Sequence, residues 1–316
     1  MQISLVTPAP KGSRSGNRAT AVRWASHLRA IGHRVRLGES YEREDGDLLV
    51  AVHAWRSAES IARFRDRFPR RPIVVLLAGT DIYSFQRSDP ATTHRSMEIA
   101  DRLVGLHALV HRDIPARFRK KLEIIYQSAR PAARRAPLAR TFEVCVVGHL
   151  REEKDPLRAA LAARRLPPVS RIRVMHLGRA VNGEWAARAR AEIAANPRYR
   201  WFGELAHGRV RHMMSRARLM VLSSRMEGGA NVVSEAICAG LPILASRISG
   251  TVGLLGADYQ GYFPVENERT LARLLARAES DPEYLKILEK QCRARAPLFR
   301  PAHEREAWRR LIAGLD

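Results

Sequence analysis

The chain has 316 residues, of which 46% are hydrophobic, and it carries a formal net charge of +23. This length predicts two domains, and the hydrophobic fraction is ample for a sizeable core. No run of about 18 uncharged apolar residues occurs, which argues against a membrane-spanning helix. Residues 1–6 lack the basic region and the long apolar stretch of a signal peptide, so we interpret them as a first strand. We therefore expect a soluble cytoplasmic protein.

The excess of basic residues raises the question of a nucleic-acid or membrane-surface partner. Lysine and arginine total 55 residues, against 32 aspartates and glutamates. The arginines are spread along the whole chain, however, and no basic block is interleaved with aromatic residues. We interpret the charge as solvated surface with a few anion contacts, and a polyanion-binding or membrane-surface protein is the minor alternative. The most basic stretch, residues 63–71, is expected at a solvated helix end.

The three cysteines, Cys145, Cys238 and Cys292, lie far apart and form no Cys-x-x-Cys pair. Each lies in an apolar pattern, which indicates reduced core thiols of a cytosolic protein. The sequence therefore predicts no structural zinc site.

The N-terminal part alternates between short apolar strands and helices. A loop rich in Gly, Pro, Lys and Arg precedes a helix that should place Val22, Ala25 and Leu28 on one face and end at Gly32. The apolar, β-branched runs that follow have the length of buried parallel strands. Strands are expected at residues 2–7, 34–37, 48–52, 73–77, 103–106 and 123–126.

A second series begins after residues 129–140, where Pro131 and Pro137 among Ala and Arg indicate a linker. Strands are expected at residues 142–147, 171–177, 200–202, 219–222 and 243–245. Helices are expected at residues 156–164, 185–195, 208–215 and 231–239, followed by a long helical region at 270–296 and a last helix at 303–315.

Strands that alternate with helices predict an α/β fold with parallel sheets covered on both faces. Two such series predict two doubly wound, Rossmann-like domains. We expect the first domain at residues 1–135 and the second at residues 136–297, with a C-terminal helix at residues 298–316 that packs back on the first domain. Ligands of such sheets lie beyond the carboxyl ends of the strands, so the loops that follow the strands are the informative ones.

The strongest functional signal is the stretch of residues 223–236, where a strand ends, a glycine pair follows and a helix begins near Asn231. Glycines allow backbone N–H groups to approach a ligand closely, and a helix N-terminus adds unpaired donors and a partial positive charge. This pattern predicts a phosphate cradle. Glu227 and Glu235 flank the cradle, and carboxylates there suit sugar hydroxyls better than phosphate. The alternative is a turn glutamate and an ordinary helix glutamate.

The Glu-x7-Glu spacing resembles the signature of retaining glycosyltransferases of family four, which have the GT-B architecture. The resemblance implies two Rossmann-like domains facing a central cleft, the first binding the acceptor and the second the nucleotide sugar. It also implies that Glu227 binds the donor hexose and acts in catalysis, and that Glu235 binds the ribose. Backbone contacts to the sugar and the diphosphate would come from Gly228, Gly229, Ala230, Asn231 and Val232.

Residues 147–155 are similar to the family's Gly-Arg-Leu-x-x-x-Lys-Gly loop, whose Arg and Lys clamp the diphosphate. Lys154 matches the lysine, and stabilising charge on the leaving nucleotide would make it catalytic. His149 stands where the arginine is usual and Asp155 where a glycine is common, and Arg151 is the residue that could compensate. Turns after two other strands are expected to contact the base or the diphosphate through Arg179, Gly203 and Leu205.

The first loop, residues 8–18, is unusually basic for the acceptor side of such an enzyme. Glycines, hydroxyls and three cations before a helix N-terminus suit a small anion. The residues expected to bind it are Lys11, Ser13, Arg14, Gly16, Asn17 and Arg18, together with Thr80 from a turn that resembles the family's Gly-Thr-Asp turn. A mobile basic loop is the alternative.

Two histidines directly follow strands of the first series. His53 comes after residues 48–52, and His107 comes after residues 103–106. Either one could bind an anionic acceptor or move a proton in catalysis. The alternative for both is a structural histidine whose hydrogen bonds are satisfied within the fold.

Over its whole length the chain resembles the selenosugar synthases of selenoneine biosynthesis. The resemblance rests on the basic first loop, on residues 78–83, on the Gly-His-Leu-Arg-Glu-Glu-Lys-Asp loop and on residues 224–231. It implies that selenophosphate attacks C1 of UDP-N-acetylglucosamine and displaces UDP. Loss of the phosphate then leaves a 1-seleno sugar.

Both compounds are substrates, so the resemblance implies no cofactor. No divalent metal is expected, because helix ends and Lys154 can neutralise the diphosphate. The alternative is a conventional family-four enzyme that transfers a sugar to a hydroxyl of a small molecule or lipid. The sequence leaves the donor preference among UDP-sugars and the oligomeric state open.

Overall fold

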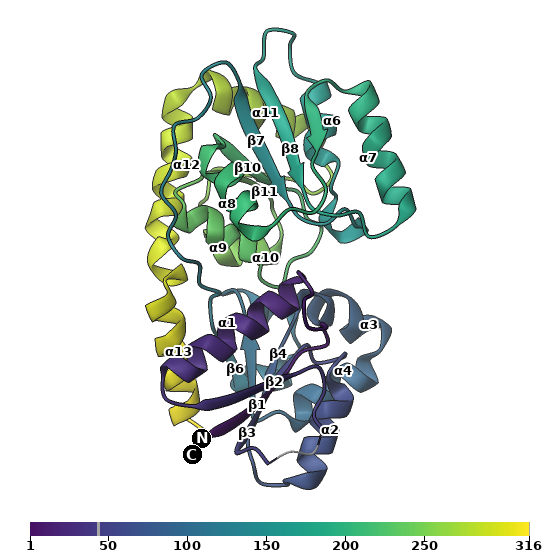
Figure 1. The fold of residues 1–316 in the computed structure, drawn as a ribbon, viewed down its shortest axis with the longest axis vertical. Helices are drawn as coiled ribbons and strands as arrows, with labels where there is room; N and C mark the ends of the chain where they lie inside the picture. The colour runs from purple at the N-terminus through teal and green to yellow at the C-terminus, as the bar shows by residue number, and fades with distance from the viewer. Residues whose placement is uncertain (43–44, 316) are drawn as a thin grey trace. The chain divides into compact units, whose positions relative to one another are not determined.

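The computed structural model describes residues 1–42 and 45–315, which form two compact units (Figure 1). The first unit comprises Met1–Ser128, Glu227–Asn231 and Leu298–Asp316, and the second comprises Ala129–Met226 and Val232–Pro297. Each unit contains a six-stranded parallel sheet with helices on its faces. The prediction of two doubly wound α/β domains is therefore confirmed.

The sheet of the first unit has the strand order β2-β1-β3-β4-β5-β6. All five residues of β3 are fully buried, as expected for a strand covered on both faces. The strands are β1 Gln2–Val6, β2 Arg34–Gly38, β3 Leu48–Val52, β4 Ile73–Leu76, β5 Arg102–Gly105 and β6 Leu122–Ile124.

The helices of this unit begin with α1, whose buried face differs from the predicted one. Val22 is 50% exposed, whereas Ala21, Trp24, Ala25 and Leu28 are buried. These four positions follow the i, i+3, i+4, i+7 pattern of a single helix face, and Val22 falls outside it. The helical segments are α1 Gly16–Ala30, α2 Ala58–Arg67, the π-helical turn η1 Asp81–Phe85, α3 Gln86–Ser88, α4 Pro90–Ile99, α5 Val110–Asp113, η2 Ala116–Lys121 and α13 Pro301–Ala313.

The C-terminal helix α13 lies against α1 within the first unit. Trp24 and Trp308 meet edge to face with their ring centroids 4.7 Å apart. Both rings join a buried cluster with Leu28, Leu311 and the sheet residue Ile3. The last helix is thus part of the core of the N-terminal unit.

The sheet of the second unit has the order β12-β11-β10-β7-β8-β9. Its strands are β7 Phe142–Val147, β8 Ile172–Leu177, β9 Tyr199–Trp201, β10 Leu219–Leu222, β11 Ile243–Ser246 and β12 Tyr262–Phe263. Its helical segments are η3 Glu152–Lys154, α6 Arg158–Arg164, α7 Gly183–Ala195, α8 His207–Arg216, α9 Asn231–Cys238, α10 Ser249–Leu255, α11 Glu268–Ser280 and α12 Pro282–Arg295, after which the short turn η4 Ala296–Phe299 leads on to α13.

The helical region predicted at residues 270–296 is present, and Asp281 and Pro282 divide it into the two helices α11 and α12, a break that was not predicted. Pro282 occupies the first turn of α12, where its missing N–H costs nothing. Oδ1 of Asp281 accepts hydrogen bonds from the N–H groups of Glu283 and Tyr284, both at 3.0 Å. The Asp-Pro pair therefore ends one helix and caps the next.

The predicted linker at residues 129–140 has no helix or strand, and the first unit ends at Ser128 where residue 135 was expected. Within the described residues, no helix combines the length and apolarity needed to cross a membrane. Those residues also contain no disulfide and no cluster of three side chains suited to a metal ion.

Candidate functional site

In the second unit, the strand order reverses next to β7, which lies between β8 and β10. Such a reversal is where doubly wound sheets bind ligands, because the loops after the two strands diverge there. The loops concerned are residues 148–155 after β7 and residues 223–226 after β10. A small pocket opens at this edge, lined among others by Gly148, His149, Lys154 and Ser223.

Ser223 fixes the conformation of the Lys154 loop. Its Oγ donates to the carbonyl oxygens of Lys154 and Asp155, at 3.2 and 2.8 Å. Asp155 has the left-handed φ of 44°, and its Oδ2 accepts a bond from Nε of Arg158 at 2.7 Å. A glycine is common at this position in the related family loop because glycine adopts this conformation without strain. Here an aspartate tied to the following helix takes its place.

Positive charges surround His149. Its Nδ1 accepts a hydrogen bond from the backbone N–H of Arg179, at the end of β8. Partial burial lowers the pKa of His149, and the nearby charges of Arg179, Arg151 and Lys154 lower it further, against the opposing effect of the Glu204 carboxylate. The ring is therefore largely neutral at pH 7. A cluster of this kind stabilises a bound anion and would draw a proton onto His149 when the anion arrives.

Arg225 connects the loops that follow β7 and β10. Its backbone N–H donates to the carbonyl of Glu153 at 2.9 Å, and its guanidinium forms ion pairs with Glu152 and Glu266. Arg151 pairs with Glu153 at 3.1 Å, so part of the charge expected to compensate for the missing arginine is already neutralised.

Glu235, on α9, contacts a histidine that the sequence analysis did not identify. Its Oε1 lies 3.0 Å from Nε2 of His207, at the start of α8, and this hydrogen bond raises the pKa of His207. Gly203 and Leu205 were predicted to contact the base or the diphosphate. They lie in the turn between β9 and α8, where Gly203 has a left-handed φ of 67°.

The remaining half of the glutamate motif, residues 227–231, belongs to the first unit. Glu227 is 6% exposed. A Cβ on Gly228 would overlap the backbone nitrogen of Gly79, and a Cβ on Gly229 would overlap the Leu106 side chain. The glycine pair is therefore required for this loop to pack against the ends of β4 and β5.

His107 is fully buried at the end of β5. Its Nδ1 accepts from the N–H of Leu109 at 3.3 Å, and its Nε2 lies 3.3 Å from the hydroxyl of Tyr83, which donates to Asp113 at 2.9 Å. Burial lowers the pKa of His107 to about 4, against the opposing effect of the carboxylates of Asp113 and Glu227. A neutral imidazole therefore lies within electrostatic reach of Glu227.

His53 is bound on both sides within the fold. It is 1% exposed and has a φ of 82°, with its Nδ1 2.7 Å from Asp81 and its Nε2 2.9 Å from the hydroxyl of Thr80. Asp81 also accepts from the N–H groups of Ala54, Trp55 and Ala78. These contacts tie the ends of β3 and β4 together, and they favour a positioning role for His53.

The basic first loop leads into α1 through an ordered cap. Oγ of Ser15 accepts from the N–H of Arg18 at 3.4 Å, and Ser13 accepts from the N–H of Ser15 at 3.2 Å. Lys11 and Arg14 are exposed, and Ser13, Asn17 and Arg18 are half-buried. A Cβ on Gly16 would lie 3.9 Å from Nδ2 of Asn231, so the start of α1 adjoins the loop that carries Glu227.

The family model described as "Glycosyl transferases group 1" matches residues 133–295, which are most of the second unit and its linker. The chain belongs to this family. Its two parallel-sheet units have the GT-B architecture, and known structures of that architecture match almost the whole chain. Among curated protein sequences, by contrast, none matches this glycosyltransferase.

Three solved structures illustrate the likeness in fold. HepE from Anabaena in complex with UDP is 14% identical over 99% of this chain and 100% of its own, with a TM-score of 0.79. A sucrose-phosphate synthase from Thermosynechococcus elongatus is 17% identical over 99% and 100% of the two chains, with a TM-score of 0.78. The trehalose-6-phosphate synthase OtsA is 11% identical over 99% and 98%, also with a TM-score of 0.78.

The predicted site residues of this glycosyltransferase thus form two groups. His149, Arg151, Lys154 and Arg179 lie together at the carboxyl edge of the second sheet. In the first unit, Glu227 lies near His107, and Asn231 lies near the start of α1. The sequence analysis did not identify His207 or Arg225 as site residues. Arg225 could have been predicted, because it lies in the loop that follows strand β10.

Proposed function

We propose that this glycosyltransferase is a selenosugar synthase, which transfers N-acetylglucosamine from UDP-N-acetylglucosamine to selenophosphate. The observation that carries the proposal is the position of the basic first loop. The N-terminus of α1, with Lys11, Arg14 and Arg18 around it, adjoins Asn231 in the loop that begins with Glu227. An anionic acceptor bound to these cations would lie beside the residue assigned to the donor hexose.

Several features support a UDP-sugar as the donor. HepE has been crystallised with UDP and with UDP-glucose, and it shares the fold of this chain. The cations around His149 suit a diphosphate, and Lys154 would stabilise the charge on departing UDP. Glu227 would bind the hexose and Glu235 the ribose, with the backbone of residues 228–232 contacting the sugar and the diphosphate.

The basic loop distinguishes selenophosphate from an ordinary hydroxyl acceptor. A hydroxyl acceptor needs a base to take its proton, whereas it gains nothing from cations. Selenophosphate needs neutralisation, because it must approach an already negative donor. Exposed Lys11 and Arg14 and half-buried Arg18 are placed to supply it.

The reaction requires little general-base assistance. A selenium lone pair attacks C1 of the sugar, the bond from C1 to the diphosphate oxygen breaks, and its electron pair leaves with UDP. Selenium is a soft nucleophile that is already deprotonated, so no proton must be removed before the attack. Water then cleaves the phosphorus–selenium bond and releases phosphate and the 1-seleno sugar. Burial lowers the pKa of His107 to about 4 and makes its ring a weak base, which is compatible with a chemical step that needs none.

The release of UDP tests the proposal. We expect UDP to form from UDP-N-acetylglucosamine with selenophosphate and not with a panel of alcohols. UDP formation with an alcohol or a lipid hydroxyl alone would identify a conventional family-four enzyme. Salt-sensitive binding to polyanions without any turnover of UDP-sugars would identify a binding protein instead.

A further inference from the structure

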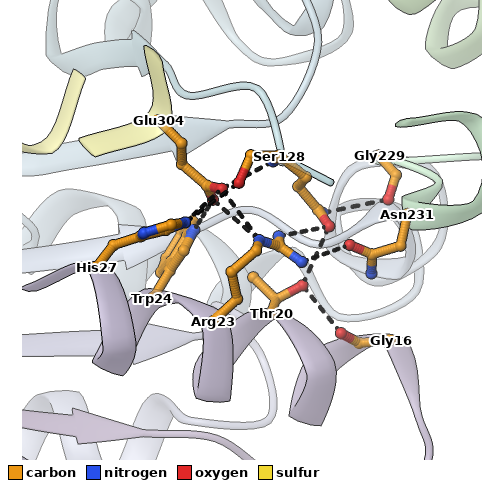
Figure 2. A network of polar contacts seen from close by, with 10 residues as sticks. Gly16, Thr20, Arg23, Trp24, His27, Ser128, Gly229, Asn231 and Glu304 are labelled. Carbon is orange, nitrogen blue, oxygen red and sulfur yellow. Dashed lines mark hydrogen bonds and ion pairs between the residues drawn. The ribbon is translucent and has the colours of Figure 1, made fainter. Parts of the chain in front are cut away.

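A buried polar network connects the C-terminal helix to the Glu227 loop inside the first unit (Figure 2). Its centre is Glu304 on α13, which is fully buried. Glu304 accepts hydrogen bonds from Nε1 of Trp24 at 2.8 Å, from the N–H of Ser128 at 2.7 Å and from Nε of Arg23 at 3.1 Å. His27 lies 3.2 Å away. A buried carboxylate with this many donors is fixed in place.

Arg23 extends from Glu304 to the loop. Its Nη1 donates to Oδ1 of Asn231 at 2.8 Å, and its Nη2 donates to Oε1 of Gln127 at 2.9 Å. Gln127 in turn donates from Nε2 to the carbonyl of Gly229 at 3.2 Å. The rigid guanidinium thus holds two oxygen atoms of one short loop, one directly and one through Gln127.

Attachment of α13 does not need this arrangement. The edge-to-face pair of Trp24 and Trp308 and the apolar cluster around it already join the two helices. Buried ion pairs, moreover, are often no more stabilising than apolar residues of the same size. What the network adds is geometry, because the bonds from Arg23 to Asn231 and from Gln127 to Gly229 end on the loop that starts at Glu227.

We propose that Arg23, oriented by Glu304, is a positioning residue that sets the conformation of residues 227–231. The inference rests on the proposed function, in which Glu227 contacts the sugar of the donor. The close packing of Gly228 and Gly229 fixes one side of the loop, and Arg23 and Gln127 fix the other.

The test compares the wild type with the double variant Arg23→Met/Glu304→Gln, which removes both charges and leaves no unpaired buried ion. Gln127→Leu is the second variant: it removes the bonds of Gln127 to Gly229, Arg23 and Thr20, and it leaves the bonds from Arg23 to Glu304 and Asn231 in place. Arg309→Met is the matched control, because Arg309 is an exposed arginine on α13 that pairs with Glu306. Hydrogen exchange of the amides of residues 227–231, UDP affinity and kcat are measured for each.

We expect faster exchange in residues 227–231 of both test variants, with α1 and α13 still protected. We also expect kcat to fall by about 100-fold, as small misplacements of a contact group do. UDP affinity should change much less, because the cations around His149 also contact the diphosphate in the proposed function. Unchanged exchange in the loop would overturn the proposal, and so would a loss of protection in α1 and α13 as large as in the loop. A wild type without turnover of any UDP-sugar would contradict the proposed function, whereas the exchange measurement would still decide the role of Arg23.

Discussion

Glu227 is the residue assigned to the donor sugar, and its buried carboxylate lies near the neutral ring of His107. We expect Glu227→Ala to lower kcat by about 100- to 1000-fold, as the loss of one stabilising group in a closed site does. UDP affinity should persist, because the cations that suit the diphosphate lie elsewhere. Steady-state kinetics and calorimetry measure the two effects. Glu306→Ala, an exposed glutamate on α13, is the control, and a kcat equal to that of the control would refute the assignment.

Arg14 is the exposed cation of the first loop that best tests the acceptor site. We predict that Arg14→Ala raises the KM for selenophosphate about tenfold, the worth of one charged hydrogen bond. The KM for the UDP-sugar should change much less. Arg63→Ala on α2 provides the comparison, since Arg63 is also exposed and pairs with its helix neighbour Glu59. Equal effects on both substrates would count against an acceptor role for the loop.

We predict that UDP binding depends on pH, because His149 lies where the diphosphate is expected. Its pKa is lowered by burial and by the cations around it, and a bound diphosphate would raise it again. Binding therefore takes up a proton, and affinity should increase as the pH falls towards 6, by about tenfold for each unit by which the pKa rises. Because UDP titrates in the same range, His149→Arg is the reference. The wild type should gain affinity at low pH relative to this variant, and parallel pH profiles would disprove the role.

At the scale of elements, Glu304 joins α13 to α1 through a charge that titrates only in strong acid. Burial would raise its pKa, but Arg23 and the hydrogen bonds from His27 and Ser128 lower it from 4.5 to about 2. Its contribution to stability is therefore fully present above pH 4.5 and is lost as the pH falls through 2. The shift corresponds to about 3 kcal/mol of unfolding free energy between the charged and the protonated carboxyl, which is not a gain over an apolar pair of the same size.

Urea denaturation at several pH values checks this prediction. The difference in unfolding free energy between the wild type and Glu304→Gln should be largest above pH 5 and should shrink as the pH falls towards 2. The comparison removes the titration of the other carboxylates, which both proteins share. A difference that does not vary with pH would show that the charge of Glu304 contributes nothing to stability.

The elements also show how far the sequence could predict the structure. Long apolar strands such as β3, β7 and β10 were predicted within a residue, since hydrophobic runs decide them locally. The face of α1 and the break at Asp281 were not, because Val22 and Trp24 compete for one core and an Asp-Pro pair can continue or divide a helical region. The two-residue strand β12 has too short a pattern to detect.

The residues of the candidate site also include some that the sequence could predict and some that it could not. Loops that follow strands could be predicted from strand order, which is why His149, Lys154 and Glu227 were identified. Contacts between distant segments could not be predicted. Arg23 and Glu304 are 281 positions apart, and no local pattern links them. Nor does any pattern show that residues 227–231 belong to a different unit from the residues on either side.

At the scale of the whole molecule, the charge of +23 and the GT-B architecture are compatible with the proposed reaction between two anionic substrates. Many arginines form ion pairs within their own unit, such as those with Glu59, Asp101, Glu192 and Glu268. These pairs neutralise part of the positive charge, and they do not form a binding site for a polyanion. The cations of the first loop and those around His149, after β7, are the ones that would contact the two anionic substrates of the proposed reaction.

Mass spectrometry of the product tests most directly whether the enzyme transfers N-acetylglucosamine to selenophosphate. The wild type is incubated with UDP-N-acetylglucosamine and selenophosphate, and the mixture is searched for the isotope pattern of selenium. We predict a selenium-containing N-acetylhexosamine that forms in step with UDP and is absent without enzyme. A reaction in which UDP accumulates with an alcohol acceptor, while no sugar carries selenium, would contradict the account.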